Sequence, residues 1–225
     1  MTTPVRTDYA QHRMDLRESR VRKLLALLAD EPRGTLLDVG CAGGELGALL
    51  AARGWRVAGA DREEALVTAA SARGLDARLA DFERRPLPWP TASVDAVVLA
   101  EVIEHVVDTD HVLGEIARVL RPGGVLVITT PNLASLENRV RLLLGRYPMW
   151  MDIQIVGTGH VRYYTPRMLR AHLQQHGFRV ERHVGNWVPI LPQRWLDDRA
   201  APWLAITGDW WPSLAMGTLM KARRE

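Results

Sequence analysis

The segment 35–47, Thr-Leu-Leu-Asp-Val-Gly-Cys-Ala-Gly-Gly-Glu-Leu-Gly, constrains the fold of this chain more than any other. An apolar run ends at Asp38, a glycine-rich stretch follows over 40–44, and helical periodicity resumes from Glu45. This order predicts a buried parallel strand, a tight turn and a helix. Glycines in such a turn let the backbone approach a ligand closely, so the segment is typical of a nucleotide-type cofactor site.

The spacing of the glycines separates two classes of cofactor. A dinucleotide site favours G-x-G-x-x-G, in which glycines hold a pyrophosphate at the helix N-terminus. Counted from Gly40, the second and third glycine positions hold Ala42 and Glu45, and the charge of Glu45 would repel a pyrophosphate there. We therefore expect a cofactor without phosphate and not a nicotinamide oxidoreductase. Asp61, 21 positions beyond Gly40, is near the spacing at which a carboxylate binds a ribose diol.

Strand-like and helix-like segments alternate along the first part of the chain. Short apolar runs at 55–60, 77–80, 94–100 and 125–130 are separated by helical segments at 63–73 and 109–120. This alternation predicts a parallel sheet covered on both faces. Ligands bind beyond the carboxyl ends of such strands, which is where Gly40, Asp61, Asp81 and Glu101 fall.

These residues resemble the class I S-adenosylmethionine (AdoMet) dependent methyltransferases. The segment 37–44 resembles their first motif, hydrophobic-Asp-x-Gly-x-Gly-x-Gly, with Ala42 at the second glycine. Because alanine is tolerated where φ stays negative, we expect this departure to change only the fine shape of the turn. Family-like blocks follow in order at 57–61, 80–82, 94–105 and 120–131. The resemblance implies an α/β, Rossmann-like, seven-stranded and mostly parallel sheet with helices on both faces, an antiparallel C-terminal strand and a helical lid.

The resemblance also implies how AdoMet is held. It assigns Asp61 to the ribose hydroxyls, Asp81 and Phe82 to the edge and face of adenine, and Asp38 to the ammonium of the methionine portion. The alternative is that Asp61 and Asp81 are helix caps or turn residues. The lone cysteine of the chain is expected to pack in the turn. The full set of expected cofactor contacts is Arg13, from an N-terminal lid helix, with Asp38, Gly40, Cys41, Ala42, Gly43, Asp61, Arg62, Asp81, Phe82, Ala100 and Glu101.

The chemistry is expected at the segment 101–105, Glu-Val-Ile-Glu-His. Glu101, Glu104 and His105 stand at a strand end and helix start, so their side chains can converge on one cleft. We expect His105 to be the general base, because the pKa of histidine lies near working pH, with Glu104 and His160 as catalytic partners.

Glu-x-x-Glu-His followed by the distant His160 also resembles the divalent-metal sites of small-RNA 3′-terminal methyltransferases and of metal-dependent ubiquinone-biosynthesis O-methyltransferases. Two carboxylates and two imidazoles, from Glu101, Glu104, His105 and His160, are suitable ligands for Mg²⁺, Mn²⁺ or Zn²⁺. Without a metal, Glu104 would cap the following helix and Glu101 would contact the cofactor.

Downstream, Thr165 as N-cap, Pro166 and Gly177 as stop predict a further helix. An apolar stripe at Leu136, Val140, Leu143 and Leu144 predicts another, which would cover the active site, bury itself in a homodimer or lie on a membrane surface. We expect a closing strand over 213–221, preceded by a loop over 188–212 whose tryptophans form a hydrophobic acceptor wall.

Composition is that of one enzyme domain. We expect one methyltransferase domain over 1–225, made of lid helices (1–30), a cofactor-binding core (34–131), a lid and substrate loop (132–164) and a C-terminal helix with strands (165–225). The net charge of +3 gives no specific sign of a nucleic-acid partner. No apolar run reaches the roughly 18–20 residues of a membrane span, and the N-terminus has no apolar signal core, so a cytoplasmic location is expected.

The expected function is O-methylation of a small metabolite, such as a natural product, a sugar or a quinone-type ring. One alternative is methylation of a terminal ribose on RNA, against which the modest net charge and the lack of an added RNA-binding domain argue. The other is a catalytically silent methyltransferase-fold subunit that binds a partner.

Overall fold

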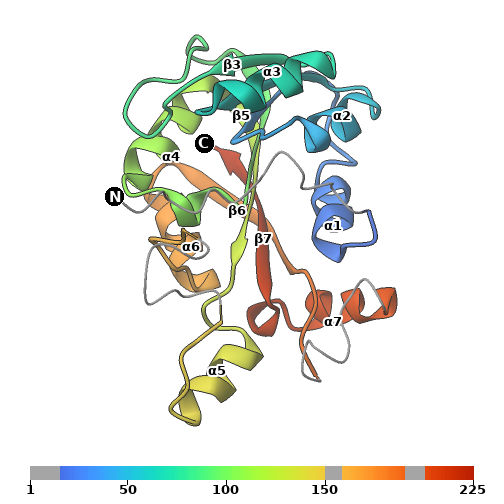
Figure 1. Cartoon of the computed structure of the whole chain (residues 1–225), viewed down its shortest axis with the longest axis vertical. Helices are drawn as coiled ribbons and strands as arrows, with labels where there is room; N and C mark the ends of the chain where they lie inside the picture. The colour runs from blue at the N-terminus through green and yellow to red at the C-terminus, as the bar shows by residue number, and fades with distance from the viewer. Residues whose placement is uncertain (1–15, 150–158, 191–200) are drawn as a thin grey trace.

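The fold is a seven-stranded sheet within the part of the chain that the computed structural model describes, which is residues 16–149, 159–190 and 201–225 (Figure 1). The strand order is β3-β2-β1-β4-β5-β7-β6. Neighbouring strands are parallel except at β7, which is antiparallel to both β5 and β6. The strands are β1 (Thr35–Val39), β2 (Arg56–Asp61), β3 (Asp76–Leu79), β4 (Val94–Ala100), β5 (Leu120–Pro131), β6 (Phe178–Gly185) and β7 (Gly217–Arg224). The predicted fold class is confirmed.

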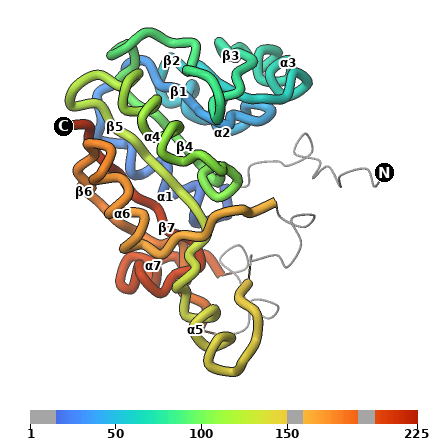
Figure 2. The backbone as a smooth tube through the Cα atoms, turned by 90° about the vertical axis from the view of Figure 1, so that its left-hand side faces the viewer, coloured from blue at the N-terminus to red at the C-terminus, as the bar shows by residue number. Residues whose placement is uncertain are grey.

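Helices cover both faces of the sheet, as Figures 1 and 2 show. Alternate side chains of the strands belong to two separate apolar clusters: Leu37 and Val39 pack with α4 and α6, whereas Leu36 packs with α1, α2 and α3. The helices are α1 (Ser19–Leu27), α2 (Glu45–Ala51), α3 (Glu64–Ala72), α4 (Thr109–Val119), α5 (Leu136–Leu143), α6 (Pro166–Gln175) and α7 (Ala205–Trp210), with short 3-10 turns η2 (Ile103–His105), η3 (Pro202–Leu204) and η4 (Pro212–Leu214).

Side-chain caps fix the starts of several helices. Thr165 accepts a hydrogen bond from the backbone N–H of Met168 at the start of α6, and Gly177 follows that helix with φ of 76°, so the predicted signals are confirmed. Asp108 caps α4 by accepting from the N–H of His111. Glu104 therefore does not cap that helix, and this alternative is wrong.

The C-terminal part departs from the sequence prediction in two ways. The last strand runs over Gly217–Arg224 rather than 213–221, and it lies between β5 and β6 instead of ending the sheet. Leu219, Met220 and Ala222 are completely buried, because a strand with neighbours on both sides and helices on both faces has no solvent side. The predicted loop 188–212 contains the helical segments η3 and α7. Along the described stretches, no helix combines the length and the apolar character that crossing a bilayer requires.

Candidate functional site

The glycine-rich turn lies where the carboxyl ends of β1, β2 and β4 meet. The N–H groups of Gly40 and Cys41 both donate to the carbonyl of Ala60, at 2.8 and 3.0 Å, so the turn folds over the end of β2. Gly40 has φ of 76°, and a Cβ there would stand 2.4 Å from Val102 Cγ2. Only glycine fits a position that is both left-handed and this close to Val102, two residues after β4.

Ala42 adopts the left-handed region, with φ of 45°. Our expectation that φ stays negative at this position is therefore wrong. In this conformation the N–H of Ala42 donates to Asp61 Oδ2 at 3.0 Å. The cost of a left-handed L-residue is about 1–2 kcal/mol, which the rest of the turn must offset.

Asp61 ties the turn to the end of β2. Its Oδ2 accepts from Ala42, its Oδ1 accepts from the N–H of Glu63 at 3.0 Å, and only 7% of the residue is exposed. Asp61 therefore also stabilises the turn, which was the alternative role expected for it. A carboxylate has about four lone-pair sites, so two remain to accept hydroxyl donors.

Asp38 is buried at the end of β1, and its Oδ2 has no hydrogen-bond partner among the residues described. Burial, and secondly the negative charge of Asp61, raise the pKa of Asp38 to about 7. A buried carboxylate oxygen without a donor is costly and requires a partner. A cationic ammonium group from a bound ligand would supply both the missing donor and the missing charge.

The other expected cofactor residues are dispersed around this turn. Cys41 is buried against Gly59, and burial raises the pKa of its thiol to about 12, so it packs as an apolar group. Phe82 belongs to the core cluster on the α4 face. Asp81 is exposed directly after β3, and its carbonyl accepts from the next turn. Ala100 pairs with Thr129 in the sheet. Arg13 lies outside the described residues.

The acidic residue at the start of α2 has its own counter-ion. Arg73, at the end of α3, pairs with Glu45 at 2.7 Å, and the Glu45 carboxylate lies 3.0 Å from where a Cβ on Gly43 would stand. This ion pair reduces the repulsion that the sequence argument ascribed to Glu45. The glycine spacing, which also disfavours a dinucleotide, does not depend on this ion pair.

Glu101 stands at the end of β4 with a left-handed φ of 55°. Its Oε1 accepts a hydrogen bond from Thr129 Oγ1 at 2.7 Å and lies 3.7 Å from the Arg20 guanidinium. These contacts hold the carboxylate beside Arg20 of α1, and its charge still acts to raise the pKa of His105. A non-glycine residue held at this φ is typical of a functional site.

Glu104 is as buried as Asp38, with 2% of each residue exposed. Thr130 Oγ1 donates to its Oε2 at 2.9 Å, whereas its Oε1 has no partner in the described parts of the chain. Burial, followed by the charge of Glu101, raises the pKa of Glu104 above its usual range. Its backbone carbonyl accepts from the N–H groups of Val161 and Arg162, which fastens the segment 159–164 to η2.

His105 and His160 lie edge to face, with ring centroids 4.7 Å apart. His105 Nδ1 is 3.2 Å from the carbonyl of Gly159, which can only accept, so Nδ1 carries the proton and Nε2 keeps its lone pair. Burial lowers the pKa of His105, and the nearby charge of the exposed Arg62 acts in the same direction. A neutral imidazole with a defined tautomer is suited to be a base or a metal ligand.

Three of the four expected metal ligands come together. Glu104, His105 and His160 each offer one ligand atom, and these atoms lie within 4.8 Å of one another. Glu101 lies outside this group. The sequence analysis missed Thr129 and Thr130, which position the two carboxylates. Their signal was a polar pair at the end of the apolar run 125–130.

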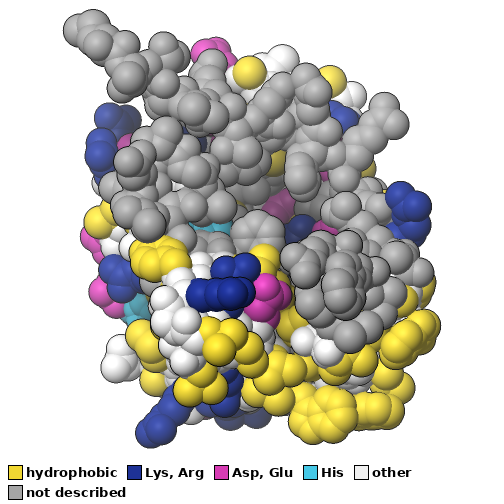
Figure 3. Space-filling model, turned by 60° about the horizontal axis from the view of Figure 1, so that its bottom comes forward, with side chains coloured by type: hydrophobic (Ala, Val, Ile, Leu, Met, Phe, Trp, Pro, Cys, Tyr) yellow, Lys and Arg dark blue, Asp and Glu magenta, His cyan; other side chains and the backbone are white. Residues whose placement is uncertain are grey.

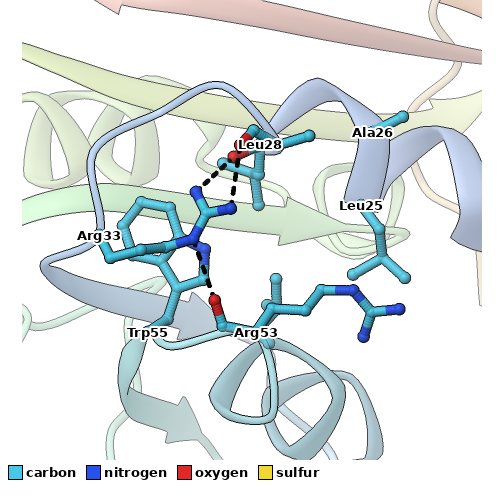
Figure 4. A pocket seen from close by; sticks show the side chains of 8 residues that line it. Leu25, Ala26, Leu28, Arg33, Arg53 and Trp55 are labelled. Carbon is cyan, nitrogen blue, oxygen red and sulfur yellow. Dashed lines mark hydrogen bonds between the residues drawn. The ribbon is translucent and has the colours of Figure 1, made fainter.

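A cavity of about 380 Å³ lies elsewhere, between the ends of α1 and α2 (Figure 4). Trp55 and Arg33 line it, and the Arg33 guanidinium lies 5.2 Å from the Trp55 ring while donating to the carbonyls of Leu28, Ala29 and Arg53. These residues precede β1 and β2, so the cavity is at the amino ends of the strands. The polar groups of the site are at the opposite ends.

The apolar stripe of α5 is exposed. Leu143 and Leu144 are 87% and 63% exposed, so the stripe does not pack on the core. Figures 1 and 3 show α5 and α7 at one end of the molecule, where hydrophobic side chains gather with basic ones among them. Of the tryptophans in the predicted acceptor wall 188–212, Trp195 lies outside the described residues, and Trp203, Trp210 and Trp211 are exposed; Trp187, just before that segment, is buried.

The comparisons with known proteins agree with this geometry. The sequence profile of the family described as "Methyltransferase domain" matches residues 10–183. The chain belongs to the class I S-adenosylmethionine-dependent methyltransferases. It is 34% identical over 184 residues to a probable S-adenosylmethionine-dependent methyltransferase of Mycolicibacterium smegmatis, which covers 75% of this chain and 66% of the relative.

Two further proteins resemble this methyltransferase, one in sequence and one in fold. It is 31% identical over 169 residues to a ubiquinone biosynthesis O-methyltransferase of Xanthomonas oryzae pv. oryzae, covering 73% of the chain and 59% of that relative. The chain thus spans about three fifths to two thirds of the length of these curated relatives. A solved S-adenosylmethionine-dependent methyltransferase from Mesorhizobium loti shares the fold, with a TM-score of 0.67 at 22% identity over 92% of this chain and 98% of that one.

Proposed function

We propose that this methyltransferase transfers a methyl group from AdoMet to a hydroxyl oxygen of a small metabolite. The observation that carries the proposal is that one edge of the sheet holds both features: the buried, unpartnered carboxylate oxygen of Asp38 near the end of β1, and the imidazole of His105 in η2, which follows the neighbouring parallel strand β4. The Asp38 oxygen suits the ammonium of the cofactor, and the His105 imidazole suits removal of a hydroxyl proton. When bound, AdoMet supplies an electrophilic methyl group on a positively charged sulfonium.

In this proposal the residues of the turn bind and orient the cofactor. Asp38 Oδ2 accepts from the ammonium, and Asp61 accepts from the ribose hydroxyls with the lone pairs that Ala42 and Glu63 leave. Gly40 and Gly43 keep the backbone open to close approach. Asp81 and Phe82 are assigned to the adenine. Alignment of this kind supplies much of the rate in a direct transfer between two bound molecules.

With AdoMet held at Asp38 and Asp61, His105 Nε2 would take the proton from the acceptor hydroxyl, so that the oxygen could form its bond to the methyl carbon while the methyl–sulfur bond breaks and S-adenosylhomocysteine leaves. The Gly159 carbonyl holds Nδ1–H and so keeps the lone pair on Nε2. The positive charge that His105 gains is stabilised by the carboxylate of Glu101, whose charge acts to raise the pKa of His105. A positioned base of this type contributes typically about 10²–10⁴-fold to the rate.

A divalent metal at Glu104, His105 and His160 is a second candidate arrangement. The unpartnered Oε1 of Glu104 and the 4.8 Å grouping of the three ligand atoms favour it. Such an ion supplies Lewis acidity that makes an acceptor hydroxyl more acidic. Because Nε2 cannot both ligate and take a proton, the two arrangements exclude each other for His105.

The acceptor that we propose is a hydroxylated quinone-type ring. This choice rests on the relatives named as ubiquinone biosynthesis O-methyltransferases and on the exposed apolar end formed by α5 and α7. We infer that this end contacts a membrane surface, since Leu143 on α5 and Trp211 after α7 are exposed and apolar, and Arg139, four positions before Leu143, is exposed and basic. Leu143→Glu should reduce co-sedimentation with phosphatidylglycerol vesicles, with Leu79→Glu on β3 as control. Unchanged co-sedimentation, or a dimer in solution that Leu143→Glu dissociates, would contradict the membrane contact.

Calorimetric titration with S-adenosylhomocysteine, with turnover on catechol-type acceptors, tests the function. Asp61→Asn should lose cofactor binding, with the exposed Asp76→Asn as control. His105→Ala should keep cofactor binding and lose turnover by at least about 100-fold, with His111→Ala as control. Full activity of His105→Ala would place the base elsewhere. Inhibition by chelator with recovery in Mg²⁺ would establish the metal arrangement instead.

The remaining alternatives have distinct outcomes. No binding of S-adenosylhomocysteine to the wild-type protein would favour a silent methyltransferase-fold subunit. Methylation of an RNA 3′-terminal ribose, without activity on small diols, would support the RNA methyltransferase.

A further inference from the structure

A second cluster of ligand-type side chains lies between α4 and α6, apart from the site described above. Asp110 on α4 faces His172 on α6 and His176 at the C-cap of that helix, and one ligand atom from each lies within 4.8 Å of the others. Both histidine Nε2 atoms are 2.9 Å from the same oxygen, Asp110 Oδ1. Figures 1 and 2 show the two helices as neighbours on one face of the sheet.

We propose that Asp110, His172 and His176 bind a transition-metal ion that clamps α4 to α6. The two histidines stand at i and i+4, so they project from one face of a rigid helix. Two imidazole nitrogens and one carboxylate oxygen suit Zn²⁺, Ni²⁺ or Co²⁺ better than Mg²⁺, which prefers oxygen ligands. The inference is independent of the proposed methyl transfer, because none of these residues belongs to that site.

His172 is oriented by a neighbouring tyrosine before any ion arrives. Tyr164 Oη lies 3.0 Å from His172 Nδ1, and the two rings are stacked at 5.9 Å. A metal-ligating histidine usually has its second nitrogen held by a hydrogen bond in this way. The tyrosine hydroxyl can donate or accept, so it supports His172 with the proton on either nitrogen.

The burial pattern leaves an entry path. The His172 and His176 side chains are 13% and 18% exposed, whereas that of Asp110 is 72% exposed. Two ligands are therefore fixed by packing and the third borders solvent, from which water can complete the coordination. Metal–ligand distances of about 2.0–2.2 Å require the atoms now 2.9 Å apart to separate slightly, and the exposed Asp110 side chain is able to move.

The clamp would join two segments that meet at the candidate active site. The helix α4 begins four residues after His105, and α6 begins six residues after His160. Tyr164 also joins the second segment to the chain just after β5, since its carbonyl accepts from the N–H of Leu133 at 2.9 Å. An ion bound here would reduce the freedom of both segments and stabilise the folded state.

The test is calorimetric titration of untagged, chelator-stripped protein with Zn²⁺ and Ni²⁺, with thermal unfolding in parallel. We expect micromolar or tighter binding and a rise in Tm of about 5 °C at an ion concentration near 100 times the Kd. His176→Ala should abolish both, and Tyr164→Phe should weaken binding by about 10–100-fold. His111→Ala, on the same helix as Asp110, is the control and should bind normally.

His160→Ala separates this cluster from the other group of ligand atoms, because it alters only the latter. Metal binding that is retained in His176→Ala and lost in His160→Ala would overturn the proposal. Absence of binding to the wild-type protein at millimolar Zn²⁺ and Ni²⁺ would also overturn it. A far-UV circular dichroism spectrum of His176→Ala that matches the wild type excludes unfolding as the cause of lost binding.

Discussion

Asp38 should make the cofactor-free protein less stable as pH rises. Its pKa is 3.8 in an unfolded chain and about 7 in the folded protein, because burial and the charge of Asp61 disfavour ionisation. The folded state therefore holds a proton that the unfolded state has lost. The contribution of Asp38 to the free energy of unfolding is complete below about pH 4 and decreases as the pH rises toward about 7. At 1.36 kcal/mol for each pH unit, the loss reaches at most about 4 kcal/mol.

Asp38→Asn removes this pH dependence with little change of shape. Near pH 4 the variant and the wild type should have similar stability, since both carry a neutral side chain. At pH 8 the variant should be more stable by up to about 4 kcal/mol, which for a chain of this size raises Tm by roughly 10 °C. Urea unfolding followed by circular dichroism across pH 4–8 measures the difference. Asp76→Asn, at an exposed position of β3, is the control.

The same variant should fail to bind S-adenosylhomocysteine, because the amide cannot offer a negative charge to the ammonium. In the wild type, cofactor binding near pH 6.5 should release a proton from Asp38, so the heat of binding should depend on the ionisation enthalpy of the buffer. A stability difference between Asp38→Asn and the wild type that stays constant from pH 4 to 8 would refute this reasoning.

Backbone strain in the glycine-rich turn gives two further predictions, both measured by urea unfolding. Ala42→Gly should stabilise the protein by about 1 kcal/mol, because glycine adopts a φ of 45° without strain. The control Ala48→Gly, within α2, should instead destabilise the protein by a similar amount. A loss of stability in Ala42→Gly would show that the backbone at this position is not strained. Gly44→Ala should cost about 3 kcal/mol, since the new Cβ would stand 2.9 Å from Ala70 Cα in addition to the strain of φ 85°. Gly74→Ala has the same φ, but its new Cβ would meet open space, so it should cost only about 1 kcal/mol. Equal losses of stability in Gly44→Ala and Gly74→Ala would show that the contact with Ala70 contributes nothing.

The sequence determined the fold class and the edge of the sheet at which the site lies. Period-two and period-3.6 patterns are local, and they indicated strands and helices in the order that makes a parallel sheet. The turn after Asp38 and the acidic residues at strand ends then had to meet at one edge, because parallel strands align their carboxyl ends. The sequence also predicted the ends of α6, because capping is local: the capping residue and its partner lie within four residues of each other.

Only the tertiary structure decided features that depend on residues far apart in the chain. The insertion of β7 between β5 and β6 follows from pairing on both sides, which no local pattern encodes. The positive φ of Ala42 accompanies a bond to Asp61, 19 positions away. The turning of Glu101 toward Arg20, and the meeting of Asp110 with His172 across 62 positions, likewise depend on helix packing over the sheet. Charge, burial and distance between such groups exist only once the chain has folded, and those quantities set the pKa of Asp38 and the tautomer of His105.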